Sequence, residues 1–191
     1  MINRKKIVCI GDSLTEGYGI HPSHRWSTLL SSNLNIEVIN SGISGDTTAG
    51  MLARFHEMVI KHKPKYTIIT GGTNDIWLNL PDNSIIGNIL AMTRHAKHYD
   101  ITPIIGIPTP FFNSEDSTDE SLFIETLSIS KRIHSFQNIV KQFAQDDHQH
   151  IIDFTLHMNP TLFLKDGLHP NEKGHKQMST QATLRMKAIL M

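Results

Sequence analysis

The chain alternates short runs of apolar residues with longer segments in which apolar residues recur every three or four positions. Short runs rich in β-branched residues are typical of buried parallel strands, whereas the longer spacing is typical of helices that bury one face. Five strands are predicted, at residues 7–10, 36–39, 66–70, 103–107 and 150–153. Predicted helices cover residues 22–34, 47–62, 84–99 and 122–145, followed by a terminal helix with an inner stripe of Met178, Ala182, Met186 and Ile189.

Strands and helices alternate along the whole length, which indicates a parallel sheet with right-handed crossovers and helices on both faces. The predicted fold class is α/β, a three-layer α/β/α sandwich around a sheet of about five strands. A chain of 191 residues without repeats or linkers fits a single domain over residues 1–191. The inner face of the second helix is expected at Met51, Leu52, Phe55, Val59 and His62.

Charge and composition narrow the range of partners. Eighteen basic and eighteen acidic residues cancel, and no block of like charge marks a surface for nucleic acid or an anionic membrane. The apolar run at residues 7–10 is too short for a signal peptide, and no segment reaches transmembrane length. Cys9 lies inside the first strand and is expected to be a small buried residue. We expect a cytoplasmic protein, without stable membrane insertion, that acts on a small molecule; no pattern specifies its oligomeric state.

The first predicted strand stops at Gly11 and is followed directly by Asp12 and Ser13. Ligands of open parallel sheets bind at the carboxyl ends of the strands, so a hydroxyl at position 13 is expected beside the substrate. The alternative is a plain turn, since Gly, Asp and Ser are the commonest turn formers. A serine hydroxyl becomes an effective nucleophile only beside a base, which in turn needs an orienting acid. The rest of the chain must supply both groups.

The segment Asp166-Gly167-Leu168-His169-Pro170 is the candidate for base and acid. Pro170 biases His169 toward an extended conformation that can present its ring. Asp166 is near enough in sequence to accept the Nδ1 proton while Nε2 faces Ser13. The alternative is a turn before the last helix with His169 at the surface. The rival acids are Asp12, Asp46, Asp75 and Asp153. Asp12 is expected to hydrogen-bond its own turn, and Asp46 and Asp75 are expected as loop and cap residues.

Acyl transfer also needs hydrogen-bond donors aimed at the oxygen on which negative charge develops. The candidates are the Ser13 N–H, the Gly45 N–H after the second strand, and the side-chain amide of Asn74 after the third strand. The structural alternative for Gly45 is a turn glycine with positive φ, and for Asn74 it is an Asx turn. Gly42 is the competing candidate to Gly45 as a donor. Four apolar residues in loops at the same edge either line a substrate pocket or simply pack: Trp77, Leu78, Phe111 and Phe112.

The remaining histidines do not suggest a metal site. His95 and His98, and likewise His148 and His150, lack a third ligand at a suitable spacing, so surface positions and no metal are expected. His175, in the second turn of the last helix, is also expected to be exposed. The polar connection over residues 108–120 is long enough to be functional or disordered, and a role as a lid stays open.

Four ordered blocks of this sequence together resemble the GDSL, or SGNH, hydrolases: Gly11-Asp12-Ser13-Leu14, Ser44-Gly45-Asp46-Thr47, Gly72-Thr73-Asn74-Asp75 and Asp166-Gly167-Leu168-His169-Pro170. Residues 40–47 look particularly like the lysophospholipase and acyl-CoA thioesterase branch, which favours Gly45 over Gly42. The resemblance implies a flavodoxin-like sandwich with Ser13 as nucleophile, His169 as base and Asp166 as orienting acid. It also implies an oxyanion hole of Ser13, Gly45 and Asn74, without metal or cofactor. Members of that branch are often exported, a point on which this chain departs.

These observations predict a serine hydrolase that cleaves carboxylic esters through an acyl-enzyme intermediate, with thioesters and lysophospholipids as further candidate substrates. The alternative on the same triad is the deacetylation of an O-acetylated carbohydrate. A third hypothesis, from another class, is a non-catalytic module in which residues 11–19 cradle a phosphate. That loop lacks both the G-x-G-x-x-G pattern and the G-K-[ST] ending of a Walker loop.

Overall fold

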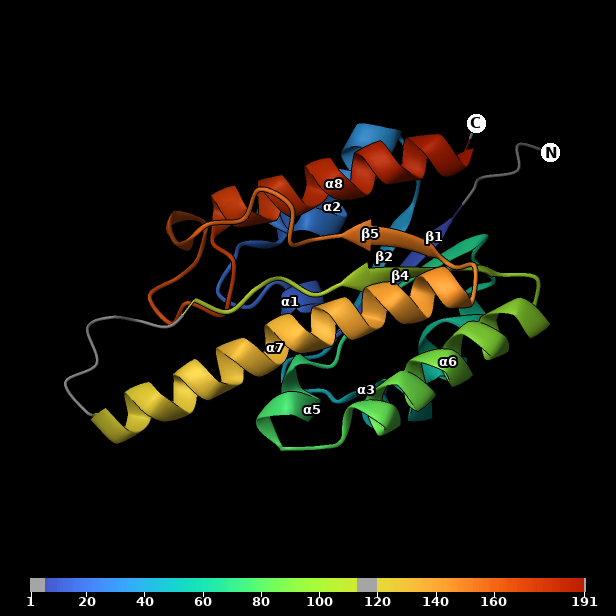
Figure 1. Ribbon diagram of the computed structural model, residues 1–191. Coiled ribbons are helices and arrows are strands. Elements are labelled where there is room, and N and C mark those ends of the chain that lie inside the picture. The colour runs from blue at the N-terminus through green and yellow to red at the C-terminus, as the bar shows by residue number, and fades with distance from the viewer. Residues whose placement is uncertain (1–5, 113–119, 191) are drawn as a thin grey trace.

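Five parallel strands form one sheet in the order β2-β1-β3-β4-β5 (Figure 1). The computed structural model describes residues 6–112 and 120–190, without the side chains of residues 120–125. The predicted α/β class and strand count are confirmed, and the strand order is that of a flavodoxin-like sheet. The strands are β1 (Ile7–Gly11), β2 (Val38–Gly42), β3 (Tyr66–Thr70), β4 (Thr102–Ile107) and β5 (His150–Asp153).

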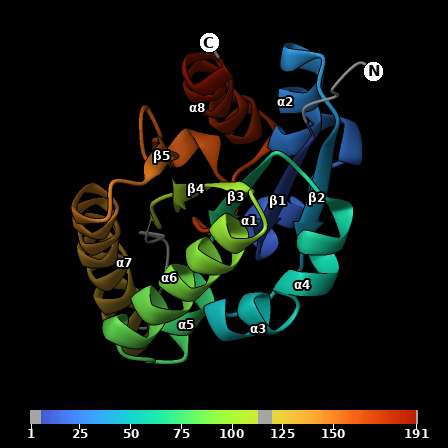
Figure 2. The same ribbon diagram turned by 90° about the vertical axis from the view of Figure 1, so that its right-hand side faces the viewer.

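Helices cover both faces of the sheet. On one face lie α2 (Trp26–Leu34) and α8 (Glu172–Leu190), which pack against each other; on the other lie α3 (Thr48–Ala53), α6 (Asp82–His98) and α7 (Glu120–Asp146) (Figure 2). The described residues contain no helix long and apolar enough to span a membrane. The short elements are α1 (Ser13–Glu16), α4 (Phe55–Met58), α5 (Thr73–Trp77) and three 3-10 turns at Pro22–His24, Ile60–His62 and Pro160–Leu162.

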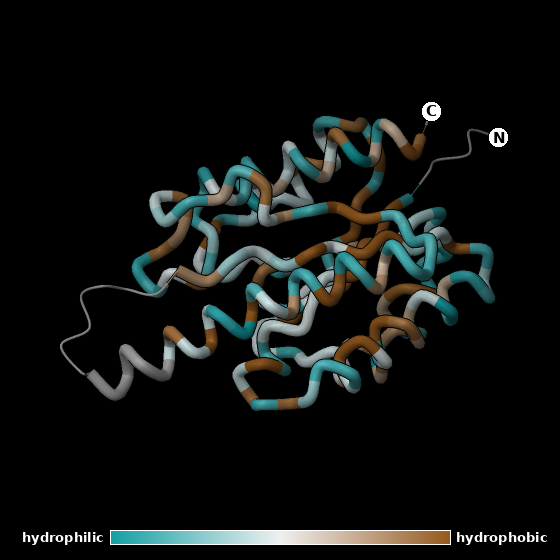
Figure 3. The backbone as a smooth tube through the Cα atoms, in the orientation of Figure 1, coloured by the Kyte–Doolittle hydropathy of each residue, from teal (hydrophilic) through white to brown (hydrophobic). Residues whose placement is uncertain are grey.

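Side-chain alternation along β1 feeds two separate cores, one on each face of the sheet. Val8 and Ile10 point toward the α3, α6 and α7 side, whereas Ile7 and Cys9 point toward the α2 and α8 side. Apolar residues accordingly concentrate along the strands and on the facing sides of the helices (Figure 3). Burial raises the pKa of the Cys9 thiol, so Cys9 is the inert apolar residue expected from its position.

The helix predicted over residues 47–62 is interrupted. It consists of α3, α4 and a 3-10 turn, and the backbone leaves helical geometry at Arg54 and again at Val59. The inner face at Phe55 and Val59 is confirmed, but His62 is exposed, because the 3-10 turn carries it away from the core.

Two other boundaries differ from the prediction. Pro22 opens a separate 3-10 turn, Arg25 is extended, and α2 begins only at Trp26. β2 runs over residues 38–42 instead of 36–39, in register with all of β1. Its polar residues fit a strand because their side chains find partners; Asn40, for example, donates to the Thr15 carbonyl at 2.7 Å. Residues 113–119, in the connection considered as a lid, lie outside the described residues.

Candidate active site

The carboxyl edge of β1 places Ser13 as the first residue of α1. The turn between them requires Gly11, because a Cβ there would lie 2.2 Å from the Thr15 hydroxyl and 2.5 Å from the Thr70 carbonyl oxygen. The Asp12 side chain caps α1, its Oδ1 accepting from the Leu14 N–H at 2.9 Å. Ser13 is nearly buried yet lines a cleft, and a helix leaves the N–H of its first residue unpaired.

A hydrogen-bonded series connects Ser13 with the loop before α8. The His169 Nε2 lies 3.0 Å from the Ser13 Oγ, and the His169 Nδ1 lies 2.8 Å from the Asp166 Oδ2. The second carboxylate oxygen of Asp166 accepts the backbone N–H groups of Leu168 and His169, each at 2.9 Å. The structure therefore brings together the three residues that the sequence singled out, across 156 positions of chain.

The hydrogen bonds at Asp166 keep its carboxyl ionised. Burial alone would raise its pKa, but the backbone N–H and ring of His169 and the N–H of Leu168 together outweigh burial and leave the pKa below its ordinary value. The loop is fixed at Gly167, whose φ is +66° and whose carbonyl accepts from the Phe112 N–H at 2.9 Å. An ionised carboxylate held in this way can fix the tautomer and orientation of His169.

Gly45 and Asn74 lie beside Ser13 in the same cleft. Gly45 has a φ of +80° at the third position of a turn from Ile43 to Asp46, which is closed by a 3.2 Å hydrogen bond. Among the described residues no acceptor meets the Gly45 N–H. The Asn74 amide donates one N–H to the Asp46 carbonyl oxygen at 2.9 Å, which leaves its second N–H available.

The cleft has a volume of about 210 Å³. Gly42, the competing glycine, does not border it: its N–H is used by the Asn40 Oδ1 at 2.9 Å, and a Cβ there would lie 2.1 Å from the Glu16 nitrogen. The cleft is lined by Ser13, Leu14, Tyr18, Ser44, Gly45, Thr73, Asn74, Leu168 and His169.

The rival aspartates bind elsewhere. Asp12 is fully buried, and burial raises its pKa to about 7, with no hydrogen-bond partner for its Oδ2 among the described residues. The Asp46 carboxylate accepts from Arg54 in the loop before α3, whose N-cap is Thr47. Asp75 lies inside α5, and its carboxylate accepts the Thr48 N–H and hydroxyl at the start of α3. Asp153 pairs with Lys141 at 2.8 Å.

The four apolar pocket candidates do not lie together around the Ser13 cleft. Trp77 and Leu78 are exposed, whereas Phe111 is buried in the core, with its ring centroid 5.7 Å from that of Trp77. Phe112 packs on Phe163, 5.1 Å between ring centroids. The described residues that line the Ser13 cleft include none of the four, and a role for them in binding stays a prediction.

Tyr18 and His175 are the residues near the site that the sequence analysis missed or misjudged. The exposed Tyr18 ring lies 4.5 Å from the His169 ring, centroid to centroid, and its place five residues after Ser13 was the available signal. His175 is buried, not exposed as expected, because α8 presses it against α2, where its Nδ1 accepts the Trp26 N–H at 3.2 Å. Burial, with smaller contributions from Arg25 and His169, lowers its pKa to about 4.

Of the two histidine pairs, His95 and His98 contact neighbouring aromatic or imidazole rings. His95 stacks on His56, with ring centroids 6.0 Å apart, and also contacts Tyr99. His148 and His150 flank the start of β5, and both side chains are exposed. The described part of the chain contains no group of three or more His, Cys, Asp or Glu side chains that could hold a metal ion.

A hydroxyl, an imidazole and a carboxylate in hydrogen-bonded series at the carboxyl edge of a parallel sheet form the geometry that serine hydrolases share. Residues 9–177 match the GDSL-like lipase/acylhydrolase family. The chain therefore belongs to this family and is an enzyme that hydrolyses ester bonds, which rules against the non-catalytic phosphate-binding module.

Relatives and solved structures agree with this assignment. The chain is 35% identical to the thioesterase 1/protease 1/lysophospholipase L1 of Escherichia coli strain K12 over 170 residues, which cover 86% of this chain and 75% of that protein. It is 25% identical to an acetylxylan esterase of Geobacillus stearothermophilus over 202 residues, covering 90% and 89% of the two chains. A GDSL-like lipase of Bacteroides thetaiotaomicron superposes with a TM-score of 0.78 at 25% identity, covering 97% and 89%.

Proposed function

We propose that this enzyme cleaves carboxylic esters by covalent catalysis, with Ser13 as nucleophile, His169 as base and Asp166 as orienting acid. The observation that carries the proposal is the series of contacts from Asp166 through His169 to Ser13, at 2.8 and 3.0 Å. These lengths allow direct proton transfer between the Ser13 hydroxyl and the His169 ring.

In this mechanism the Ser13 Oγ attacks the ester carbonyl carbon while its proton moves to the His169 Nε2. The tetrahedral intermediate collapses as His169 returns that proton to the departing alcohol, which leaves an acyl group on Ser13. Water then enters, and it attacks the acyl carbonyl carbon while His169 takes one of its protons. The second tetrahedral intermediate collapses as His169 gives that proton to the Ser13 Oγ, which releases the acid and restores Ser13. Asp166 remains ionised throughout and stabilises the imidazolium that forms in each half of the reaction.

The developing oxyanion is assigned to the N–H groups of Ser13 and Gly45 and to the Asn74 amide. All three residues line one cleft, and each carries an N–H that the fold leaves available. A donor of this kind typically contributes about 10²–10³-fold to turnover.

A volume of about 210 Å³ suits a short acyl group, so simple short-chain esters are the first substrates to test. Thioesters and lysophospholipids, named for the Escherichia coli relative, are longer-chain candidates. The second candidate function is deacetylation of an O-acetylated carbohydrate. It is favoured by the polar residues of the cleft, among them Ser44, Thr73 and Asn74, and by the likeness to an acetylxylan esterase.

The decisive experiment compares wild type with Ser13→Ala on p-nitrophenyl acetate and butyrate, acyl-thioesters and acetylated sugars. Ser13→Ala is expected to lose at least about 10³-fold in kcat, because the covalent intermediate cannot form, with its melting temperature unchanged. Ser32→Ala, at an exposed serine of α2, is the matched control and should keep wild-type rates. An alkylphosphonate should label Ser13 alone. Full activity in Ser13→Ala would refute the assignment, and a preference for acetylated sugars would select the deacetylase.

A further inference from the structure

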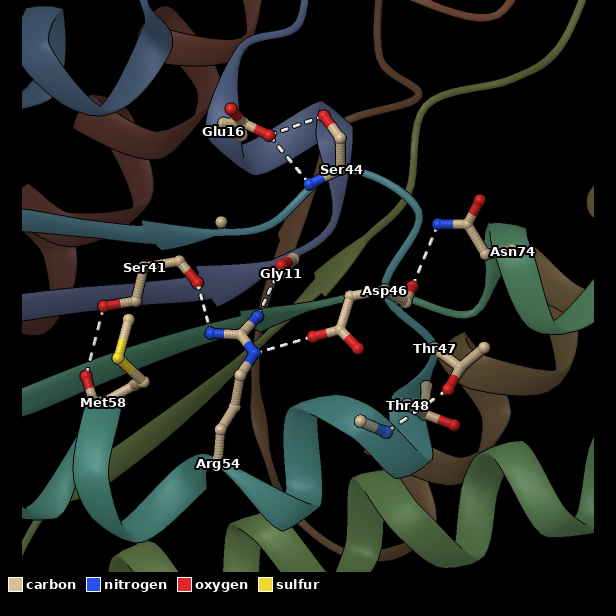
Figure 4. A network of polar contacts seen from close by, with 12 residues as sticks. Gly11, Glu16, Ser41, Ser44, Asp46, Thr47, Thr48, Arg54, Met58 and Asn74 are labelled. Carbon is tan, nitrogen blue, oxygen red and sulfur yellow. Dashed lines mark hydrogen bonds and ion pairs between the residues drawn. The ribbon is translucent and has the colours of Figure 1, made fainter.

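The turn that contains Gly45 is held from two sides (Figure 4). On one side, the Glu16 Oε2 accepts the Ser44 N–H at 2.7 Å and the Ser44 hydroxyl at 2.5 Å. Glu16 is the last residue of α1, the same short helix that begins at Ser13. The Ser44 hydrogen bonds lower the pKa of the Glu16 carboxyl, so it is ionised at neutral pH and accepts both bonds as a charged group.

On the other side, Arg54 joins three segments through one guanidinium. Its Nε donates to the Asp46 carboxylate at 2.6 Å, its Nη1 to the Ser41 carbonyl and its Nη2 to the Gly11 carbonyl, both at 2.8 Å. Gly11 precedes the nucleophile turn, and Ser41 lies near the end of β2, so the guanidinium fixes the Asp46 side of the turn relative to both strand ends (Figure 4). The Arg54 and Asp46 side chains are mostly buried, 15% and 13% exposed, which protects the pair from solvent screening.

The same aspartate also holds the third oxyanion donor. The Asp46 carbonyl oxygen accepts from the Asn74 side-chain amide at 2.9 Å, so an aspartate whose side chain is fixed by Arg54 orients the Asn74 amide. A Cβ built at Gly45 would meet no atom within 4 Å, and no acceptor among the described residues meets the Gly45 N–H. Its N–H direction therefore depends on Ser44 and Asp46, the two residues that Glu16 and Arg54 bind.

We propose that Glu16 and Arg54 are positioning residues that hold the Gly45 N–H and the Asn74 amide in place for the oxyanion. This inference rests on the proposed function, because it assigns a purpose to those donors. Neither side chain lines the cleft. Oxyanion donors act by being fixed before the reaction, and displacing a reacting or stabilising group by about 1 Å can cost on the order of 10²-fold in rate. Loosening the turn should therefore lower kcat and leave KM unchanged.

The test uses Glu16→Ala, Glu16→Gln and Arg54→Lys in the full chain. Glu16→Ala removes both bonds to Ser44 and is expected to lower kcat about 10-fold, with KM within about 2-fold of wild type. Glu16→Gln keeps one acceptor and should recover most of the loss. Arg54→Lys keeps the charge but cannot make three fork-like bonds, and a fall in kcat of about 10-fold to 100-fold is expected. The inhibition constant of a trifluoromethyl ketone, which forms the tetrahedral oxyanion, should rise in the same proportion as kcat/KM falls.

Matched controls are Glu57→Ala and Arg94→Lys, which alter exposed ion pairs with Lys61 and Asp147 far from the cleft and should keep wild-type kcat. Melting temperatures show which variants are folded. If Arg54→Lys does not fold, the Glu16 variants still test the inference, because Glu16 is less buried. Wild-type kcat and inhibitor affinity in Glu16→Ala would overturn the inference. So would equal losses in the Ala and Gln variants. An inactive Ser13→Ala beside a fully active Glu16→Ala would refute the positioning role alone, whereas an active Ser13→Ala would refute the mechanism on which it rests.

Discussion

Two loops meet at Ser13, the turn after β1 and the segment before α8, and each carries an aspartate close to it. Asp12 is fully buried with one backbone donor, and burial raises its pKa to about 7. Asp166 is partly exposed with three donors, which outweigh burial and lower its pKa. The aspartate adjacent to Ser13 in sequence therefore titrates near neutral pH, whereas the distant one is ionised there. The number of hydrogen-bond donors and the exposure to solvent, not proximity in sequence, decide which carboxyl can orient a base.

Two histidines, His169 just before α8 and His175 inside it, show a similar contrast. His169 reaches the cleft, where its two nitrogens contact Ser13 and Asp166. His175, six positions later, is buried between α8 and α2 and accepts the Trp26 N–H, so that its pKa falls to about 4. One imidazole is placed to exchange protons, and the other is held neutral as an acceptor inside the protein.

The sharpest way to break the contrast between the aspartates is Asp166→Asn. The amide keeps the shape of the side chain but removes the charge that fixes the His169 tautomer, and a loss of about 10³–10⁴-fold in kcat is expected. Ester hydrolysis at pH 8 measures it, with Asp147→Asn, at a carboxylate that pairs with Arg94, as the control. If Asp166→Asn is active and Asp12→Asn is not, the roles of the two aspartates are the reverse of those argued here.

Asp12→Asn sharpens the same contrast through stability. A folded-state pKa of about 7 against an ordinary 3.8 means that the protonated carboxyl fits the fold. Its stabilisation is complete below pH 4 and is lost as the pH rises to 7. Over this range the free energy of unfolding of Asp12→Asn, relative to wild type, should rise by about 1.4 kcal/mol per pH unit. Urea denaturation from pH 4 to 8 measures the difference, and a constant offset would contradict a buried neutral Asp12.

His175→Gln tests the contrast between the histidines and has the opposite sign. A folded-state pKa of about 4 against an ordinary 6.5 means that the neutral imidazole stabilises the fold. That stabilisation is complete above pH 6.5 and is lost as the pH falls to 4, by about 3 kcal/mol at most. Glutamine can still accept the Trp26 N–H, so the variant should lose less stability than wild type between pH 6.5 and 4. His62→Gln, at an exposed histidine, should behave as wild type.

The architecture was predictable from the sequence because most strands contain a short apolar run and each long helix has a periodic apolar stripe. The run at residues 7–10 alone identified β1, and residues 66–70 and 150–153 gave β3 and β5 without error. The sequence misplaced β2 because Asn40 and Ser41 read as loop residues, and only their side-chain partners make them tolerable in a strand. Residues 47–62 were predicted as one helix because the spacing of apolar residues does not reveal that the backbone leaves helical geometry at Arg54.

At the site, the local motifs predicted which residues lie together, but the sequence did not predict the contacts between distant segments. The proximity of Ser13, His169 and Asp166 was expected and is found in the structure, while their catalytic roles stay predictions. The burial of His175 depends on how α8 packs on α2, which no spacing within α8 encodes. The contacts of Glu16 and Arg54 with residues 28 and 8 positions away are likewise products of the fold.

The smallest expected effect concerns the contact between the Tyr18 and His169 rings. The Tyr18 ring lies 4.5 Å from the His169 ring at an angle of 40°. In the proposed mechanism His169 takes the serine proton, and an aromatic ring this close would stabilise the imidazolium by a cation–π interaction of about 0.5–1 kcal/mol at an exposed site. Tyr18→Leu should therefore lower kcat/KM about 2-fold to 5-fold. Tyr18→Phe, which keeps the ring and loses the hydroxyl, should match wild type.

Tyr99→Leu, at an exposed tyrosine that contacts His98, is the matched control, because it also removes an aromatic ring beside a histidine but lies in the loop after α6. Steady-state hydrolysis of p-nitrophenyl acetate resolves effects of this size. Equal losses in Tyr18→Phe and Tyr18→Leu would assign the effect to the hydroxyl. An unchanged Tyr18→Leu would mean that the Asp166 carboxylate alone stabilises the charged histidine, and the contrast between the two loops would then lie in the carboxylates.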